Sequence, residues 1–298
     1  MTVCIAAVFE DSNRIIAVTD SRISSDEQSA EGVAKLFFLP RKRWAVMFAG
    51  DVRSATSLVE RIRADMPREH DLNVDAFIQI CETAYRTELL KGVETEILLP
   101  FGMSRHEFLT TGRQCFGDQR FDNLVERISQ ASLGVELLCA GFDDRGYPHL
   151  LEVTAAGAIV RCSHLPFHAI GSGALMALTS LYPLRIASET YEALIYRCCA
   201  AKFAAESSPG VGRETTVYTF GPQSDSIRHV MSGRLDPLRD VWMSLGQPPV
   251  PTEALAVVAT GLKTAEQNHH ASVRARPMLE QQWKEMQRRR GRIDSDDA

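Results

Sequence analysis

The chain has 298 residues, enough for one large domain or two modest ones. Its net charge of −5 argues against nucleic acid or an anionic membrane as the main partner, because both bind basic surfaces. The seven cysteines form no CxxC pair and no signal peptide is visible. We therefore expect a cytoplasmic protein with free thiols, without a disulfide framework or metal site.

The first predicted elements are strands joined as hairpins. Residues 2–9 are apolar at nearly every position, which is typical of a strand covered on both faces. Residues 10–14 form a turn, and 15–20 form the second strand. Residues 34–40 and 43–50 predict another hairpin.

Helices are predicted next. Apolar residues recur at three-four spacing through 51–66, and Asn73 can cap a second helix that runs to about residue 90. Residues 92–116 are mixed in character and are interpreted as an insertion or loop. A further short helix is expected over 121–132.

The remaining elements repeat this order. Three strands are expected within 135–162, and residues 167–173 lead into a helix over about 172–181. We interpret the uncharged stretch 164–184 as strand, turn and helix, not as a membrane span. A longer helix and two strands follow, at about 186–205, 215–221 and 226–232.

This order predicts an α+β fold with helices grouped in pairs between runs of strands. Two antiparallel sheets stacked face to face, with helix pairs outside, give a four-layer αββα sandwich. We expect one domain over 1–233, with an insertion at about 92–116. Residues 234–298 are expected to form a helical C-terminal extension with a polar tail.

Thr2 is the first candidate for chemistry. Methionine aminopeptidases accept small second residues, so removal of Met1 would leave a free α-amine beside the threonine hydroxyl. An α-amine titrates near neutral pH and can act as base for its own side chain. The alternative is that Thr2 simply begins a strand.

Asp20 and Lys35 lie where hairpins would bring them towards residue 2. There the lysine charge would favour an ionised hydroxyl and the aspartate would orient the lysine. They could instead be a turn aspartate and a lysine at a strand edge. The N–H of Gly50, between a strand and a helix, could hold an oxyanion, or the glycine could merely permit the turn.

Residues 171–173, Gly-Ser-Gly, follow a strand and open a helix. A turn is the default interpretation, because neither a dinucleotide fingerprint nor a nucleophile elbow is complete here. The eight histidines show no close metal-ligand spacing. No cofactor is expected.

Several stretches in order resemble the proteasome β-subunit family of N-terminal nucleophile (Ntn) hydrolases, and the similarity covers roughly residues 2–231. The stretches are 2–22, from the threonine to Asp-Ser-Arg; 33–39, with the lysine; 46–51, with the glycine; and 137–157 followed by 169–182.

The resemblance implies a role for each candidate residue. Thr2 would be the nucleophile and its amine the base, with Asp20 and Lys35 adjusting the reactivity of the hydroxyl. The Gly50 N–H would hold the oxyanion, and Ser172 would hydrogen-bond near the amine. It also implies a substrate side-chain pocket formed by Ile23, Val33, Phe48 and Val52, whose apolar character predicts a hydrophobic preference.

The resemblance further implies a threonine peptidase in a ring-like homo-oligomer that acts on peptides or unfolded proteins. It leaves open whether an ATPase partner exists. A non-catalytic assembly or scaffold protein that retains Met1, and a small-substrate amidase, are the alternatives. One departure concerns the support of the amine, because the family has an aspartate where this chain has Ser207 or Ser208.

Overall fold

The computed structural model describes residues 2–11, 13–24, 29–30, 34–67, 72–162, 164–182 and 190–245. The described residues up to Ser244 form one compact unit. This unit extends past the expected domain end at residue 233, because α7 (Asp236–Leu245) packs Leu238 and Trp242 against its core. The polar tail expected beyond α7 lies outside the described residues.

One five-stranded antiparallel sheet contains the N-terminal hairpin. Its strand order is β10-β1-β2-β11-β12. The bounds are β1 (Cys4–Phe9), β2 (Arg14–Asp20), β10 (Phe167–Ile170), β11 (Thr215–Phe220) and β12 (Arg228–Gly233). In the central pair Cys4 lies opposite Thr19, so the start of β1 and the end of β2 meet at one edge of the sandwich.

The second five-stranded antiparallel sheet has the order β5-β6-β7-β8-β9. Its strands are β5 (Leu36–Phe38), β6 (Trp44–Gly50), β7 (Val135–Phe142), β8 (Pro148–Val153) and β9 (Ile159–Arg161). A 3₁₀ turn at Pro40–Lys42 joins β5 to β6. A small ribbon of β3 (Ile23–Ser24) and β4 (Ser29–Ala30) follows β2.

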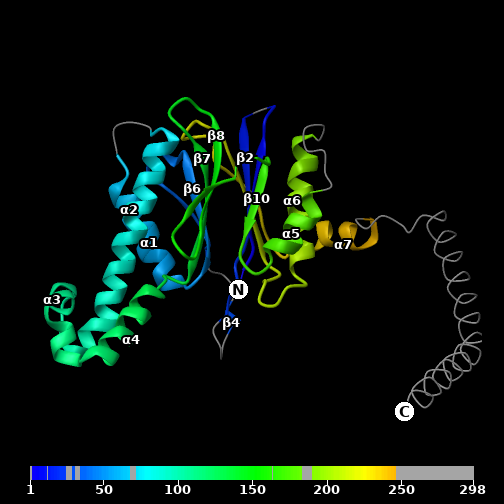
Figure 1. Cartoon of the computed structure of the whole chain (residues 1–298). Coiled ribbons are helices and arrows are strands. Elements are labelled where there is room, and N and C mark those ends of the chain that lie inside the picture. The colour runs from blue at the N-terminus through cyan, green and yellow to red at the C-terminus, as the bar shows by residue number, and fades with distance from the viewer. Residues whose placement is uncertain are drawn as a thin grey trace, which may run out of the picture. The chain divides into compact units, whose positions relative to one another are not determined.

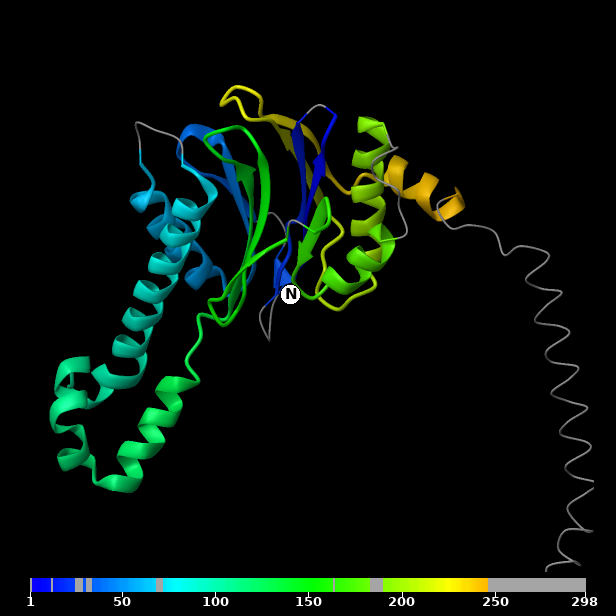
Figure 2. The same ribbon diagram turned by 45° about the horizontal axis from the view of Figure 1, so that its top comes forward.

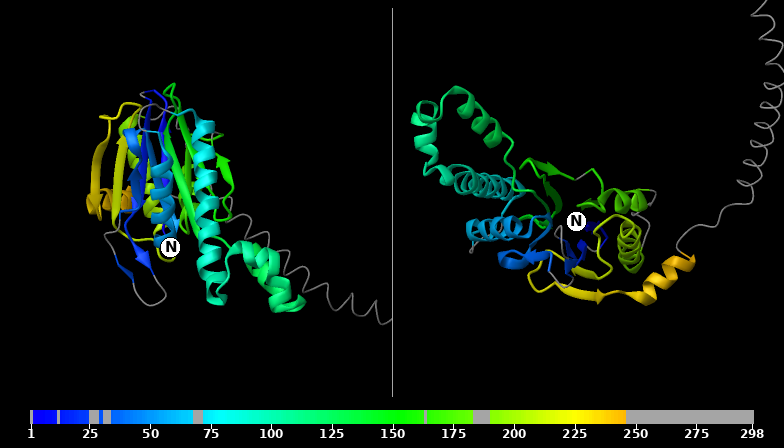
Figure 3. Two further views of the ribbon diagram at one scale, coloured as in Figure 1. Left: turned by 90° about the vertical axis from the view of Figure 1, so that its left-hand side faces the viewer. Right: turned by 90° about the horizontal axis from the view of Figure 1, so that it is seen from below.

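Helix pairs cover the two outer faces, as Figures 1 and 3 show. Helices α5 (Ala174–Leu181) and α6 (Tyr191–Ala205) cover the first sheet, and α1 (Val52–Asp65) and α2 (Val74–Gly92) cover the second. The predicted four-layer αββα sandwich is therefore confirmed. Among the described helices, none combines the length and apolarity that crossing a bilayer requires.

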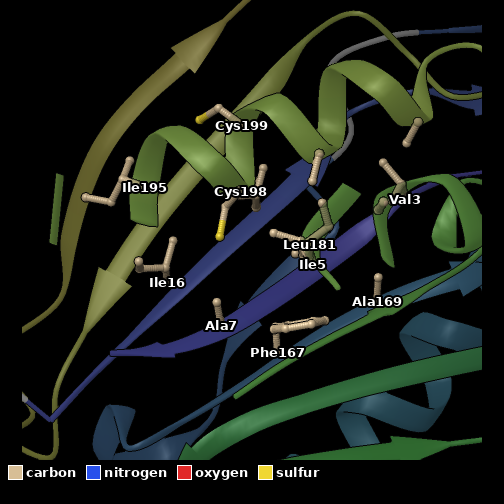
Figure 4. Packing of buried hydrophobic residues seen from close by; sticks show 14 of the residues in the cluster. Val3, Ile5, Ala7, Ile16, Phe167, Ala169, Leu181, Ile195, Cys198 and Cys199 are labelled. Atoms are coloured by element: carbon tan, nitrogen blue, oxygen red, sulfur yellow. The ribbon is translucent and has the colours of Figure 1, made fainter. Parts of the chain in front are cut away.

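Side-chain alternation along β1 explains why the whole strand is buried. Ile5 and Ala7 point towards α5 and α6, into the cluster drawn in Figure 4, whereas Cys4 and Ala6 face the second sheet. Successive strand residues point to opposite faces, so a strand between two layers needs apolar residues throughout. The position of β1 between a helix layer and the second sheet therefore explains the apolar run in residues 2–9.

The segment interpreted as an insertion or loop is helical. A π-helical stretch (Val93–Leu98), a 3₁₀ turn (Leu99–Phe101), α3 (Arg105–Phe116) and α4 (Asp118–Ser129) form the insertion arm, defined here as residues 93–129. Figure 2 shows α3 and α4 at the end of α2, beyond the sheets. Ser104 and Glu107 start α3 with a capping box, and Phe108 stacks on Phe121 in a separate apolar cluster.

Candidate active site

Thr2 lies two residues before the start of β1 and is buried, with 2% of its surface exposed. Its Oγ1 contacts both the Asp20 carboxylate and the Lys35 ammonium group. Lys35 Nζ lies 2.9 Å from Asp20 Oδ1. Both charged side chains are almost completely buried, so a hydroxyl, a cation and an anion share one desolvated space.

The fold explains this meeting of residues that are distant in sequence. Asp20 ends β2, and its N–H donates to Val3 O at 3.2 Å, which aligns it with the start of β1. Lys35 comes from the other sheet, one residue before β5, where its carbonyl accepts the Phe48 N–H at 3.3 Å. Cys4 Sγ donates to Phe48 O at 3.3 Å and ties the two sheets together beside the site.

Asp20 is fixed by backbone donors as well as by the lysine. Its Oδ1 accepts the Val3 N–H at 3.0 Å, and its Oδ2 accepts the N–H groups of Arg22 at 3.2 Å and Gly212 at 3.1 Å. An ionised carboxylate has only acceptors, so this set of donors suits the charged form. The carboxylate is thereby held in one orientation towards Thr2 and Lys35.

The Gly171–Gly173 turn contacts the backbone of Thr2. The Thr2 N–H donates to Ser172 Oγ at 3.2 Å, and the Gly173 N–H donates to Thr2 O at 3.1 Å. Gly171 has φ +89°, and a Cβ there would lie 2.5 Å from Thr2 O. A larger residue would displace Thr2, so this position needs glycine.

Gly50 ends β6 at the same edge of the sandwich. It has φ +108°, and a Cβ there would lie 2.1 Å from Gly134 O. The preceding residue, Ala49, has its Cβ 3.1 Å from the position that a Cβ on Gly171 would take, beside Thr2 Cγ2. The strand carrying the candidate oxyanion donor therefore runs next to the Thr2 turn.

The thiol of Cys4 is the closest cysteine in sequence to Thr2. Burial, and next the charge of Asp20, hold the pKa of this thiol far above its ordinary value. Cys4 therefore stays protonated and packs as an apolar residue between the sheets. It does not compete with Thr2 as a nucleophile.

The four residues implied for the substrate pocket are only partly described. Phe48 and Val52 belong to one cluster under α1, where Phe48 is 1% exposed and stacks on Phe37 with centroids 6.0 Å apart. The side chain of Ile23 and all of Val33 lie outside the described part of the chain. The pocket therefore stays a prediction.

The sequence connects the turn after α6 with the site only through Ser207 or Ser208, and it gives no sign of the contacts that the backbone of this turn makes. Ser208 O accepts the Val211 N–H at 3.3 Å, and Pro209 O lies 3.4 Å from Ser172 Oγ. The turn thus reaches the site through backbone atoms, including the Gly212 N–H on Asp20. A backbone donor leaves no residue-type pattern, so nothing in the sequence pointed to Gly212.

A group of possible metal ligands lies outside this site. The ligand atoms of Glu152, Cys162 and His168 lie within 4.8 Å of one another. The His168 ring bonds the Glu152 carboxylate at 2.7 Å, and burial with the nearby Glu152 charge raises the pKa of Cys162 to about 11. A hydrogen-bonded pair beside a protonated thiol accounts for this group without a metal ion.

Comparison with known proteins agrees with this architecture. Residues 117–198 match the family model for proteasome subunits. A solved structure described as "Anbu (Gly-1) mutant" from Hyphomicrobium sp. strain MC1 matches with a TM-score of 0.55 and 14% identity over 82% of this chain and 94% of that one. This chain has the proteasome-like Ntn hydrolase fold. The resemblance predicted from the sequence is thus confirmed.

No curated protein matches the chain by sequence. The region that matches the proteasome subunit model includes Ser172 but not Thr2, Asp20 or Lys35. The structural match, at 14% identity, speaks for the fold alone. The roles of these residues in this proteasome-like chain are therefore argued from their contacts.

Proposed function

We propose that the chain is a threonine peptidase whose nucleophile is Thr2, exposed by removal of Met1. One observation carries the proposal: the Thr2 hydroxyl contacts both Lys35 and Asp20 in a buried site. A buried ion pair is costly to maintain, and charged groups in contact with a buried hydroxyl suit the activation of a nucleophile. An ordinary first strand residue needs neither partner.

In the proposed mechanism the free amine of Thr2 accepts the proton of its own Oγ, and the oxygen attacks the substrate carbonyl carbon. An α-amine with a pKa of about 8 is partly unprotonated at neutral pH. The nearby Lys35 ammonium stabilises the developing negative charge on Oγ, and Asp20 holds that ammonium in place. Ser172 Oγ would orient the amine, as it now accepts the Thr2 N–H.

Attack converts the carbonyl into a tetrahedral oxyanion, for which the Gly50 N–H is the proposed donor. Collapse breaks the peptide bond, and the Thr2 ammonium returns the proton to the leaving amine. This leaves an ester on Thr2 Oγ. Water, deprotonated by the same amine, hydrolyses the ester and restores the free hydroxyl.

Thr2→Ala and Thr2→Ser test the nucleophile directly, with short fluorogenic peptides that carry an apolar residue before the scissile bond. The Ala variant is expected to lose hydrolysis by at least about 10³-fold, because the attacking atom is absent. The Ser variant keeps that atom and should retain measurable activity. Hydrolysis by Thr2→Ala at the wild-type rate would exclude Thr2.

We also propose a ring-like homo-oligomer located in the cytoplasm, with peptides or unfolded proteins as substrates. The alternatives give different results in the same assays. A scaffold protein would hydrolyse neither peptides nor small amides, whereas an amidase would act on small amides and leave the peptides intact. An amidase stays an alternative because Ser207 or Ser208 stands where the family has an aspartate, so the amine has one fewer charged support than the resemblance implies.

A further inference from the structure

Lys202, on α6, is a buried charge that the proposed chemistry does not use. Its side chain is fully buried, and its Nζ donates to Gly212 O at 2.7 Å and to the Glu206 carboxylate. Burial lowers the pKa of Lys202, and the bond to Glu206 partly opposes that effect. Because burying a charge costs free energy, packing alone does not explain an ammonium group in this position.

Gly212 connects this lysine to the candidate active site. The Gly212 carbonyl accepts from Lys202, and the Gly212 N–H donates to Asp20 Oδ2 at 3.1 Å. The residue is therefore held from both sides, by a lysine on α6 and by the aspartate on β2. A shift at Gly212 would change the donor set that orients Asp20.

Helix α7 contacts both Glu206, the partner of Lys202, and the residue that follows Gly212. Arg239 bonds both oxygens of Glu206 and lies over the Phe203 ring, with its guanidinium carbon 4.5 Å from the centroid. Arg239 Nη2 also donates to Arg213 O at 3.1 Å, one residue beyond Gly212. α7 therefore supports the turn directly and through Glu206.

Apolar side chains surround this network. Phe203 and Cys198, on the same helix, belong to the buried cluster between α6 and the first sheet. A methionine of similar length would fill the space of Lys202 without the cost of burying a charge. The lysine differs from methionine in one useful respect, because it donates to Gly212 O and Glu206.

We propose that Lys202 is a positioning residue for Asp20, acting through Gly212, and that Arg239 of α7 completes its support. The inference deepens the proposed function and rests on it, since Asp20 matters there through Lys35 and Thr2. It makes α7 part of the working enzyme, although α7 lies beyond the region that resembles the family.

Lys202→Met tests the inference with two readouts. Peptide hydrolysis should show kcat reduced at least tenfold with KM within twofold of wild type, because Lys202 contacts the Gly212 turn and not the substrate. Amide hydrogen exchange at Gly212 should accelerate at least tenfold, a readout that needs no activity. The exchange rates of amides in β1 should stay at their wild-type values.

Two further variants separate positioning from stability. Cys198→Ala, which removes a buried side chain from the same helix and cluster (Figure 4), should keep the wild-type kcat. If Lys202→Met does not fold, Lys202→Met combined with Glu206→Gln is measured instead. The amide oxygen introduced at position 206 can still accept from Arg239, which also keeps its bonds to the carbonyls of Arg213 and Arg234. A folded double variant should keep the low kcat and the fast exchange at Gly212.

The outcomes are distinct. Unchanged kcat and unchanged Gly212 exchange in a folded Lys202→Met or double variant would overturn the positioning role. Wild-type protein that lacks Thr2-dependent hydrolysis would overturn the proposed function instead, and Gly212 exchange would still show whether Lys202 holds the turn.

Discussion

Replacing Lys35 with methionine removes the cation from the buried pair with Asp20 and leaves the carboxylate without its counter-charge. The pair has an N–O distance of 2.9 Å and almost no exposure. Coulomb's law at an effective dielectric constant of about 20 gives an attraction of roughly 6 kcal/mol at that distance, before desolvation. Breaking a buried pair by removing one partner typically costs about 3–5 kcal/mol, and we expect Lys35→Met to lower the free energy of unfolding by an amount in that range.

The assay is urea unfolding followed by circular dichroism, at one protein concentration so that any assembly contributes equally. Asp20→Asn should also lose about 3–5 kcal/mol, because it strands the Lys35 ammonium. The variant with both changes should lose clearly less than the sum, with a coupling of at least about 1 kcal/mol. Single losses below about 1 kcal/mol, or strict additivity, would refute the reasoning.

A solvent-exposed pair provides the matched control. Asp122 Oδ1 lies 2.8 Å from Arg113 Nη2 in the insertion arm, with both side chains more than half exposed. Exposed ion pairs contribute about 0–1 kcal/mol. Asp122→Asn should therefore lower the free energy of unfolding by less than about 1 kcal/mol. That result would show that burial, not proximity, determines the cost of breaking the Asp20–Lys35 pair.

Three further predictions follow from single positions. Gly171→Ala should abolish peptide hydrolysis and lower Tm, since its Cβ would collide with Thr2 O; wild-type kcat in this variant would contradict the close approach of this turn to Thr2. Burial raises the pKa of Cys199 to about 12. The protonated thiol therefore contributes fully to the free energy of unfolding below the unfolded-state pKa near 9, and this contribution is lost as the pH rises towards 12. The stability difference between wild type and Cys199→Ala in urea should thus fall by roughly 1 kcal/mol from pH 8 to pH 10, and a constant difference would refute it. Phe108→Ala should speed hydrogen exchange within residues 93–129 alone, because Phe108 packs in a separate cluster; equal acceleration in the sheets would refute that.

Much of the fold could be predicted because burial on two faces leaves a strong pattern. Residues 2–9 are apolar throughout since β1 lies between a helix layer and a second sheet. The cap at Asn73 was also predictable, and its side chain does accept the Ala76 N–H at 2.8 Å. The helices within residues 92–116 were missed because their apolar face packs within the arm, where few positions are buried. The capping box at Ser104 and Glu107 was a usable indication of a helix start.

The candidate site was predictable where it depends on side chains. Thr2, Asp20 and Lys35 carry distinctive chemistry at the ends of predicted strands. The β1–β2 hairpin brings Thr2 and Asp20 together, whereas Lys35 reaches them from the other sheet, which hairpin pairing does not predict. Contacts made by backbone groups, such as the Gly212 N–H on Asp20, could not be predicted, because any residue type supplies an N–H. The role proposed for Lys202 depends on that contact, so it too required the fold.

The central claim is that the Thr2 amine and hydroxyl act together, and the intact mass of the purified protein tests it most directly. Our account predicts the mass of a chain that lacks Met1 and begins with Thr2. It also predicts that a peptide electrophile adds one equivalent to Thr2. A mass that includes Met1 in protein that hydrolyses peptides would contradict the account, because the proposed base would then be a peptide nitrogen.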